Sequence, residues 1–432
     1  MLEVQFGSRR RTCDGTSRRN FLRVGALGAS GVTLAHLLER RAAAQTTAKK
    51  DAAVIWVWLN GGPTHIETFD PKMGAPGEFR SVTGEVATKL PGVTLGGNFE
   101  RLAKIADKMV FVRSFAVPTS SHNRAAFWIN TGFAHNANRP SIGSIVSRVR
   151  GSNHRVTGMP TYVKMGQIGF NDDAPRIPGP AWLGKAYSPF APSGPARDNM
   201  NLATTVERLE DRRKLLQRLD QLRRESDTSG VIEGVDGLNR QALTLILGKA
   251  PEAFDLKKED PATVARYGGG LGASLLTARR LCEAGCGFVA ASLQGWDMHG
   301  NVKGGMDRRG PEVDRAVSAL VEDLHQRGLD KKILVVVSGE FGRTPRINKR
   351  AGRDHWGALS TLALAGGGLQ VGQVVGQSSD KAEVPKSSVV TPQDLMTTVF
   401  HTLGIPAETS FADPSGRPTR MMANGKLIPG LV

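Results

Sequence analysis

Residues that can bind a metal ion follow apolar segments of the sequence in four separate places. Each set contains His, Asp, Glu or Ser side chains, which ligate divalent metals or act as nucleophiles beside them. The four sets are Asn60, His65 and Asp70; Ser120, Ser121 and His122; Asp297 and His299; and Glu340 and Arg343. Another apolar run is preceded by a fifth set, Arg353, Asp354, His355 and Trp356. A mixture of His and carboxylates favours Zn²⁺, Mn²⁺ or Fe over Ca²⁺, which prefers a shell of oxygen atoms.

The chemistry that such a collection could perform is hydrolysis of an anionic ester. One or two divalent ions, Zn²⁺ or Mn²⁺, would polarise a phosphoryl or sulfuryl oxygen and make a hydroxide or a Ser alkoxide available at neutral pH. Arg343 is the candidate for holding the anionic oxygens of the ester, because a guanidinium binds such groups in a bidentate manner. Further basic residues follow it closely: Arg346, Lys349, Arg350 and Arg353.

The elements that would position these residues alternate between strands and helices. Apolar, β-favouring runs predict strands at 52–59, 109–115, 287–293, 332–338 and 361–365. Helical spacing and capping residues predict helices at 124–131, 271–284, 311–327 and 391–403. Strand, helix and strand in succession favour parallel pairing, and parallel sheets bind ligands beyond the carboxyl ends of their strands. We therefore predict an α/β fold with a mostly parallel sheet sandwiched between helices, in which four of the sets share one edge.

The segment between the second and third predicted strands has a different character. Residues 151–195 are rich in Pro and Gly without a clear period, which predicts long loops. Apolar residues at helical spacing over 202–219 then predict an amphipathic helix with balanced charges. We expect residues 45–432 to form one α/β domain, with this loop-rich and helical insertion at about 151–260. Cys282 and Cys286 are predicted to be free buried thiols, because a disulfide at i, i+4 in a helix would be strained.

The first 44 residues resemble a twin-arginine signal peptide. Arg18 and Arg19 precede an uncharged stretch over 24–38, and Ala42 and Ala44 supply the small residues of a cleavage site. No apolar run reaches the length of about 18 residues that a membrane-spanning helix needs, so no transmembrane segment is expected. The sequence thus predicts export by the twin-arginine pathway to the periplasm or cell envelope. The alternative is a basic N-terminus that resembles a signal by chance.

The composition is that of a globular protein with a basic surface. Of the 432 residues, 40% are hydrophobic and 22% are charged, which is enough to bury a sizeable core. The net charge is +17, and behind residue 44 the 49 basic and 37 acidic residues leave +12, which favours anionic partners. Nucleic acid is not expected as a partner, because only 6% of residues are aromatic and no nucleic-acid-binding motif is present. The sequence gives no indication of the oligomeric state.

Four stretches together resemble the exported bacterial family called domain of unknown function 1501. They are residues 57–72 (VWLNGGPTHIETFDPK), 295–299 (GWDMH), 339–345 (GEFGRTP) and 352–356 (GRDHW). The resemblance runs from about residue 52 to the C-terminus, and this family looks like a distant relative of the alkaline phosphatase and sulfatase superfamily. It implies an alkaline-phosphatase-like or sulfatase-like sheet between helices, and a site with one or two metal ions that hydrolyses esters.

The resemblance also implies which residues would bind the metals. It places the first ion on Asp297, His299 and His355. For the second ion, the usual Asp after the first strand is Asn60 here and the usual Asp-His pair is Glu340-Phe341. Substitutes are therefore expected among His65, Asp70, Glu340 and Asp354.

The catalytic residues implied by the resemblance are Ser120, Ser121, His122 and Arg343. Ser120, Ser121 and Thr119 lie about where the superfamily has its nucleophile, and Arg343 would bind the substrate anion. No Cys-x-Pro-x-Arg motif occurs in the sequence, so a formylglycine sulfatase is not expected.

The leading prediction is an exported metal-dependent hydrolase of phosphate or sulfate esters, acting on an anionic small molecule or glycan. A second possibility is a non-catalytic, sulfatase-like scaffold that binds glycans or an envelope partner, which the departures at Asn60 and Phe341 favour. A third is a structural role in a large envelope assembly. A loop histidine taken singly is also often only a structural hydrogen-bonding residue, so the site prediction depends on the sets meeting in space.

Overall fold

The computed structural model describes residues 51–170, 177–192, 250–422 and 424–432. These residues belong to one unit of the chain, Ala48–Val432. The predicted signal peptide and the predicted helix at 202–219 lie outside the described residues, as does part of the insertion predicted at about 151–260.

A seven-stranded sheet forms the centre of this unit, with the strand order β11-β4-β10-β7-β1-β6-β5. The strands are β1 (Ala53–Asn60), β4 (Val110–Val112), β5 (Tyr162–Met165), β6 (Phe288–Gln294), β7 (Ile333–Ser338), β10 (Leu362–Gly366) and β11 (Gln373–Val375). β1 pairs in parallel with both β6 and β7, whereas β10 runs antiparallel to β7 and to β4. Every residue of β1 is buried, as its unbroken apolar sequence requires in a strand covered on both faces.

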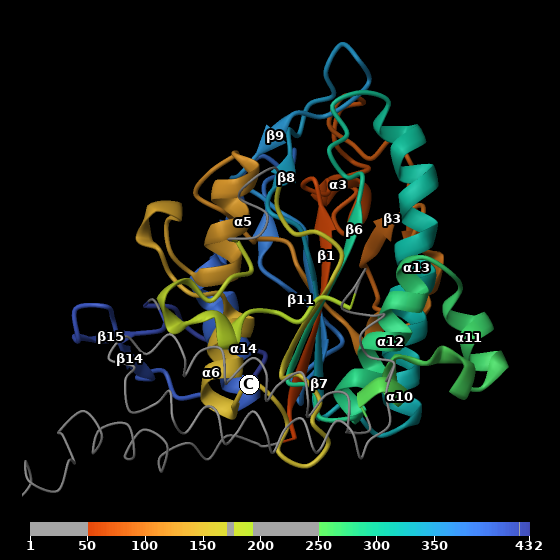
Figure 1. Cartoon of the computed structure of the whole chain (residues 1–432). Coiled ribbons are helices and arrows are strands. Elements are labelled where there is room, and N and C mark those ends of the chain that lie inside the picture. Colours follow the sequence, from red (N-terminus) through yellow and green to blue (C-terminus); the bar gives the residue numbers. More distant parts are fainter. Residues whose placement is uncertain (1–50, 171–176, 193–249, 423) are drawn as a thin grey trace, which may run out of the picture. The chain divides into compact units, whose positions relative to one another are not determined.

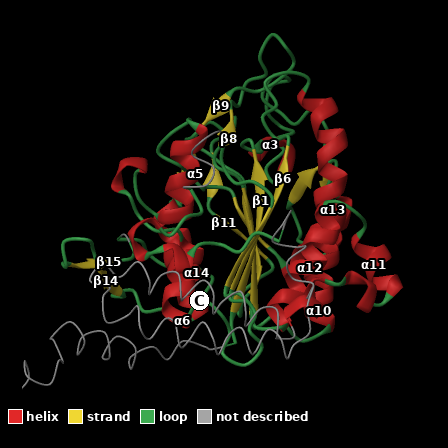
Figure 2. Cartoon of the chain, viewed as in Figure 1, coloured by secondary structure: helices red, strands yellow, loops and turns green. Residues whose placement is uncertain are grey.

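Helices cover both faces of the sheet (Figures 1 and 2). One face carries α4 (Glu100–Lys104), α10 (Ala250–Phe254), α11 (Pro261–Tyr267), α12 (Leu271–Glu283) and α13 (Val302–Gln326). The other carries α5 (His122–Thr131), α6 (Ile142–Arg150) and α14 (Pro392–Leu403). Alternate residues of β1 serve the two layers, since Ile55 and Val57 pack in one hydrophobic core and Val54 and Trp56 in the other. The predicted fold class is confirmed: a mostly parallel sheet lies between two layers of helices.

The remaining elements are short. They are α3 (His65–Thr68), the strand pairs β2 (Glu85–Ala87) with β3 (Thr94–Gly96), β8 (Gly342–Arg343) with β9 (His355–Trp356), β12 (Gln377–Ser378) with β13 (Pro385–Ser387) and β14 (Ser410–Ala412) with β15 (Pro418–Arg420), and 3₁₀ turns at Ala106–Lys108, His135–Ala137, Ala181–Leu183, Lys185–Tyr187 and Leu256–Lys258. Among the described helices, none combines the length and apolar character needed to span a bilayer.

Two elements differ from the sequence predictions. α13 begins at Val302 rather than at Pro311, because the Asn301 side chain caps it and the proline lies inside the helix. The glycine-rich sequence before Pro311 had concealed this first part, since Gly and Pro both disfavour helix. β5 was expected to be loop, but its four residues extend the main sheet by pairing with β6.

Other predictions agree with the structure. α14 has a capping box between Thr391 and Asp394, and it ends at Gly404 in the left-handed conformation. Cys282 and Cys286 are free thiols, and burial raises the pKa of both.

The direction of the strands brings the five candidate sets to one edge of the sheet. β1, β6 and β7 are parallel, and β4 shares their direction because both β4 and β7 run antiparallel to β10. β10 starts at the edge where these strands end, so the residues preceding it arrive there too. In Figure 1, α3, β8 and β9 lie beyond the carboxyl ends of β1 and β6.

Candidate metal centre

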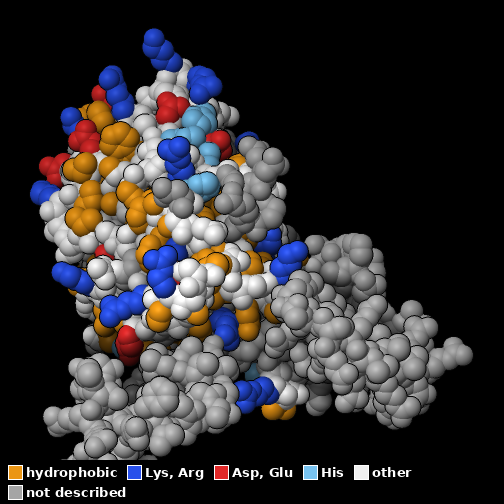
Figure 3. All heavy atoms as spheres, turned by 60° about the vertical axis from the view of Figure 1, so that its left-hand side comes forward, with side chains coloured by type: hydrophobic (Ala, Val, Ile, Leu, Met, Phe, Trp, Pro, Cys, Tyr) orange, Lys and Arg blue, Asp and Glu red, His pale blue; other side chains and the backbone are white. Residues whose placement is uncertain are grey.

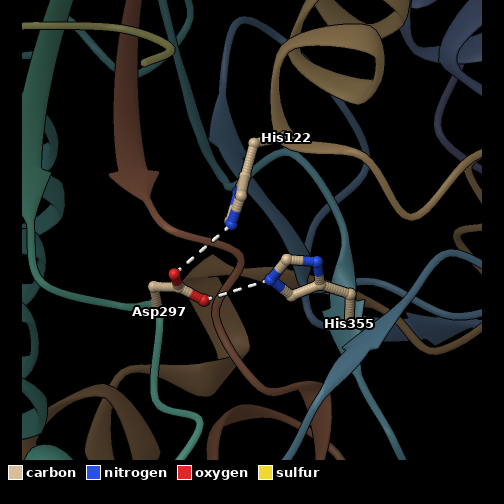
Figure 4. Close-up of side chains that lie close together, drawn as sticks. All are labelled: His122, Asp297 and His355. Atoms are coloured by element: carbon tan, nitrogen blue, oxygen red, sulfur yellow. Dashed lines mark hydrogen bonds and ion pairs between the residues drawn. The ribbon is translucent and has the colours of Figure 1, made fainter. Parts of the chain in front are cut away.

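Three histidines surround one carboxylate at this edge, and we call Asp297, His122, His299 and His355 the Asp297 cluster. The Nε2 atoms of His299 and His355 lie 3.0 and 3.2 Å from Asp297 Oδ1. His122 Nε2 lies 3.5 Å from the other oxygen, Oδ2. Figure 4 shows His122 and His355 pointing at Asp297 from two sides. The ligand atoms of His122, Asp297 and His355 are all within 4.8 Å of one another, close enough to share one ion.

The second ring nitrogen of each histidine faces an acceptor. His122 Nδ1 is 2.6 Å from Glu340 Oε1, and His299 Nδ1 is 2.7 Å from Asp354 Oδ1. His355 Nδ1 is 3.1 Å from the carbonyl oxygen of Ser120. A neutral imidazole that donates from Nδ1 has a free lone pair on Nε2, which is how metal-binding histidines are oriented in proteins. In the tautomer that donates from Nδ1, each of the three histidines would direct an Nε2 lone pair toward Asp297.

The donor set fits a divalent cation. Ligand atoms about 2.1 Å from a tetrahedral ion are about 3.4 Å apart, close to the separations around Asp297. The Nε2 atoms of His299 and His355 are 2.9 Å apart, and two lone pairs at that distance repel unless a proton or a cation lies between them. His122 Nε2 is buried and faces Asp297 Oδ2 at 3.5 Å. The ligand atoms that lie within 4.8 Å of one another, two imidazole nitrogens and one carboxylate oxygen, match Zn²⁺ better than Ca²⁺ or Mg²⁺.

The charges of the cluster are strongly coupled. Burial raises the pKa of Asp297, but hydrogen bonds from His122, His355 and Arg343 outweigh burial and hold the pKa far below its usual range. Burial lowers the pKa of His122, but contacts with Asp297 and Glu340 raise it to about 9. The cluster thus holds an ionised carboxylate that attracts positive charge on its histidine side, where a metal ion could replace the proton.

Arg343 occupies a different position from the one predicted for it. Its side chain is fully buried, and Nε and Nη1 donate to the carbonyl oxygens of Gly62 (2.8 Å) and Arg353 (3.1 Å). Nη2 donates to Gly61 O and to Asp297 Oδ1. The guanidinium is buried and donates to these acceptors, so Arg343 orients Asp297 in this structure, and a contact with the ester stays a prediction.

His65 and Asp70 lie apart from the Asp297 cluster, although both were predicted as metal ligands. They line a small buried cavity of about 10 Å³ with Arg113 and Ser360, which we call the His65 pocket. His65 Nε2 is 3.0 Å from the carbonyl oxygen of Ala382, and burial lowers the pKa of His65 to about 4. The structure therefore does not bring His65 and Asp70 together with the Asp297 cluster.

Asp70 and Asn60 are both satisfied by neighbours in the fold. Asp70 accepts a hydrogen bond from Ser378 and forms ion pairs with Lys72 (3.3 Å) and Arg113 (3.5 Å). Asn60 Oδ1 accepts from the Trp58 indole at 2.8 Å and from the Gly169 amide at 3.0 Å. Neither side chain is left available for a second ion.

Glu340 and Asp354, also predicted as ligands, contact the histidines rather than the centre itself. Glu340 is fully buried and also accepts the Gly61 amide at 2.9 Å. Asp354 Oδ2 accepts from Asn348 at 3.1 Å, and the hydrogen bonds from His299 and Asn348 lower the pKa of Asp354. Both carboxylates hold histidines of the cluster, a role that the sequence did not distinguish from metal ligation.

The two candidate nucleophiles are exposed beside the cluster. Ser121 is the N-cap residue of α5, and His122 is the first residue of that helix. Ser120 contacts the cluster through its backbone, because its carbonyl oxygen faces His355 Nδ1. The structure thus places both serines next to the cluster, at the positive end of a helix dipole.

Several contributors were not predicted from the sequence. Gly61 has φ +121°, and a Cβ there would lie 2.4 Å from the backbone nitrogen of Asp297. Glu67 and Arg353 form a fully buried ion pair with Nη2 to Oε1 at 2.8 Å, next to Asp354 and His355. The Asn-Gly-Gly-Pro turn after β1 was a signal for the glycine, but nothing in the spacing indicated the ion pair.

The family model for protein of unknown function (DUF1501) matches residues 51–432. The chain belongs to this family. The family identified from the four sequence motifs is thereby confirmed. No curated protein matches the chain.

Solved structures similar to the chain include a sulfatase, a lipoteichoic acid synthase and a zinc-bound periplasmic domain, all of distant sequence. PsFucS1 sulfatase from Pseudoalteromonas sp. has 13% identity and a TM-score of 0.41, with 86% of this chain and 72% of that chain covered. The lipoteichoic acid synthase LtaP from Listeria monocytogenes has 10% identity and a TM-score of 0.40, over 91% and 81% of the two chains. The C-terminal periplasmic domain of EcEptC from Escherichia coli, in complex with Zn, has 10% identity and a TM-score of 0.40, over 89% and 94%. The similarity is too distant to assign the activity of any of them to this chain.

Proposed function

We propose that the chain binds one divalent cation, preferentially Zn²⁺, in the Asp297 cluster and hydrolyses phosphate or sulfate esters there. The observation that carries this proposal is the convergence of three Nε2 atoms on one carboxylate, with each Nδ1 held by its own acceptor. One ion is favoured over two because His65 and Asp70 lie in the His65 pocket, and Glu340 and Asp354 contact the histidines.

A cation in this position would act as a Lewis acid on an ester oxygen and lower the pKa of a bound water. The residues of the chain supply the rest. Asp297 is 39% exposed at its side chain, so the cluster is open to substrate. Arg343 keeps Asp297 ionised and fixed in orientation, while Glu340 and Asp354 hold the Nδ1 protons of His122 and His299.

The nucleophile in this proposal is Ser120, Ser121 or water. The serines are exposed at the start of α5, where the helix dipole favours an anion such as an alkoxide or a phosphoryl oxygen. Export through the twin-arginine pathway to the periplasm or cell envelope belongs to the same proposal, because that pathway carries folded proteins and would let the ion be loaded first.

A second candidate function is a metal-dependent binding protein without turnover. The observation that favours it is Phe341, whose fully buried ring packs 4.7 Å from the ring of His122 and 4.8 Å from that of His355. This apolar ring occupies the side of the cluster next to Glu340, where a further polar ligand would otherwise be possible.

Elemental analysis of the purified chain and assays on aryl phosphate and aryl sulfate esters test both candidates. The hydrolase predicts about one Zn²⁺ per chain and turnover of one ester class, with both lost in His355→Ala. The matched control is His401→Ala, an exposed histidine of α14, which should retain both. Bound metal without turnover of any ester would favour the binding protein, and a chain that binds no metal would refute both.

A further inference from the structure

The connection between β8 and β9 carries basic side chains that the Asp297 cluster does not use. We call residues 346–350 the basic loop, and its Arg346, Lys349 and Arg350 are all exposed. Arg343 and Arg353, which lie on either side of it, are fully buried. Of the basic residues that follow β7 closely in sequence, only those of the basic loop present their charges to solvent.

Asn348 joins the basic loop to the Asp297 cluster. Its Oδ1 accepts the backbone amides of Arg350 (2.9 Å) and Gly352 (3.0 Å), which folds the loop around the side chain. Its Nδ2 donates to the carbonyl oxygen of His299 (3.0 Å) and to Asp354 Oδ2 (3.1 Å). Because Asp354 holds the His299 ring, one amide side chain fixes both the loop and a metal-ligand candidate.

Backbone contacts hold the same loop in place. The carbonyl oxygens of Arg350 and Ala351 accept the amides of Asn301 (2.9 Å) and Val302 (2.8 Å), just behind His299 in the chain. Ala351 has φ +52°, a conformation that a non-glycine residue keeps only where its surroundings impose it. The basic side chains therefore project from a fixed backbone.

Of the charges of the loop, that of Arg350 lies next to Asp354, and all three face solvent. Arg350 Nη2 is 3.9 Å from Asp354 Oδ1, yet the Arg350 side chain is 69% exposed. The acidic side chain of Asp354 is already bound by His299 and Asn348. Figure 3 shows Lys and Arg side chains next to exposed His side chains on one face of the molecule. An exposed guanidinium and ammonium on one fixed loop can bind a phosphate or sulfate group.

We propose that the basic loop is a second anion-binding subsite, so that the preferred substrate carries two anionic groups. One is the ester that reacts at the Asp297 cluster, and the other is a phosphate or sulfate that Lys349 and Arg350 bind. The first half rests on the proposed function, whereas the second rests on the geometry of the loop alone.

Calorimetric binding of two sugars to the Zn²⁺-loaded full chain tests the proposal. Glucose 6-phosphate and glucose 1,6-bisphosphate share one sugar and differ in the number of anionic groups. The bisphosphate should bind about tenfold more tightly than the monophosphate, as expected for one added set of charge-assisted hydrogen bonds. In Lys349→Ala/Arg350→Ala this ratio should fall to about threefold or less, and Arg350→Glu should reverse the preference.

The matched control is Lys331→Ala/Lys332→Ala, which removes two positive charges at the opposite end of β7. It should leave the ratio unchanged. The proposal is overturned if the wild-type chain shows no preference, or if the preference survives removal of Lys349 and Arg350. Ester turnover without a preference for the bisphosphate would refute the subsite alone. A preference that depends on Lys349 and Arg350 in a chain without turnover would support the subsite and refute the hydrolase.

Discussion

The Asp297 cluster and the His65 pocket contain the same kinds of side chain at the same edge of the sheet, but we propose an ion only in the first. In the cluster, the Nδ1 atom of each histidine faces a hydrogen-bond acceptor. The Nε2 atom of each faces the carboxylate of Asp297. In the pocket, His65 has its Nε2 on a backbone carbonyl, and Asp70 is paired with two basic side chains. The comparison shows that ligand chemistry depends on which ring nitrogen the fold leaves free, as well as on residue type.

Exposure separates the two regions further. Asp297 is 39% exposed at its side chain and Asp70 only 5%. A charged group in the His65 pocket is therefore matched by internal partners that stabilise the fold, whereas the cluster can exchange ions and substrate with solvent. We expect mutations in the cluster to change metal binding and mutations in the pocket to change stability.

The largest predicted effect is on metal affinity when each carboxylate is changed separately. Asp297→Asn should weaken Zn²⁺ binding by more than about 100-fold, because loss of a ligand lowers metal affinity more than loss of a group that only orients a ligand. Asp70→Asn should leave Zn²⁺ affinity unchanged and lower the denaturation midpoint instead. Competition with a chromophoric chelator measures the affinities. Equal losses in both variants would mean that the two regions do not differ as proposed.

Glu67 lies on α3 between His65 and Asp70, and its replacement should cause the largest effect on stability. Glu67→Ala leaves the fully buried Arg353 without its partner, which should cost about 3–5 kcal/mol of unfolding free energy. Urea denaturation measures this cost. Glu67→Gln retains the shape and should cost less, so equal destabilisation by the two variants would show that the charge of the pair is unimportant.

His65 should make stability depend on pH. Burial lowers its pKa from 6.5 in the unfolded chain to about 4 in the fold, so the unfolded state binds more protons between those values. Its contribution is therefore fully present above pH 6.5 and falls as the pH drops toward 4, by about 3 kcal/mol in total. His65→Gln should flatten the unfolding free energy against pH in that range. An unchanged slope would show that another group titrates there.

Changes at Glu340 and Asp354, the carboxylates that contact the histidines, should have the smallest effect on Zn²⁺ affinity. Glu340→Gln and Asp354→Asn remove the charge that holds a histidine but keep its hydrogen-bonding shape, so Zn²⁺ affinity should fall by about 10- to 100-fold. The same chelator competition compares them with Asp297→Asn. Losses as large as that of Asp297→Asn would indicate that these carboxylates are ligands themselves.

The sequence predicted that residues far apart in the chain lie close together, because their proximity depends on the direction of the strands. The apolar runs of β1, β6 and β7 identified a parallel sheet, which brings Asp297 and His299 to the edge where β1 and β7 end, whereas His355 reaches that edge because β10 runs antiparallel to β7. The short strand β5 could not be predicted, because its four residues gain their structure from pairing with β6.

The roles of individual side chains were harder to predict. His65 and Arg343 follow strands just as the cluster residues do, but both are buried against carbonyl oxygens of residues with positive φ. His65 contacts Ala382, and Arg343 contacts Gly61 and Gly62. Spacing also does not show which carboxylates ligate and which hold a histidine, as Glu340 and Asp354 illustrate.

Anomalous diffraction at the zinc absorption edge, from crystals of the purified chain, tests the central claim most directly. We predict one peak about 2.0–2.2 Å from Asp297 and from the histidine Nε2 atoms that face it. A chain without an anomalous peak, or with a peak in the His65 pocket instead, would contradict the account.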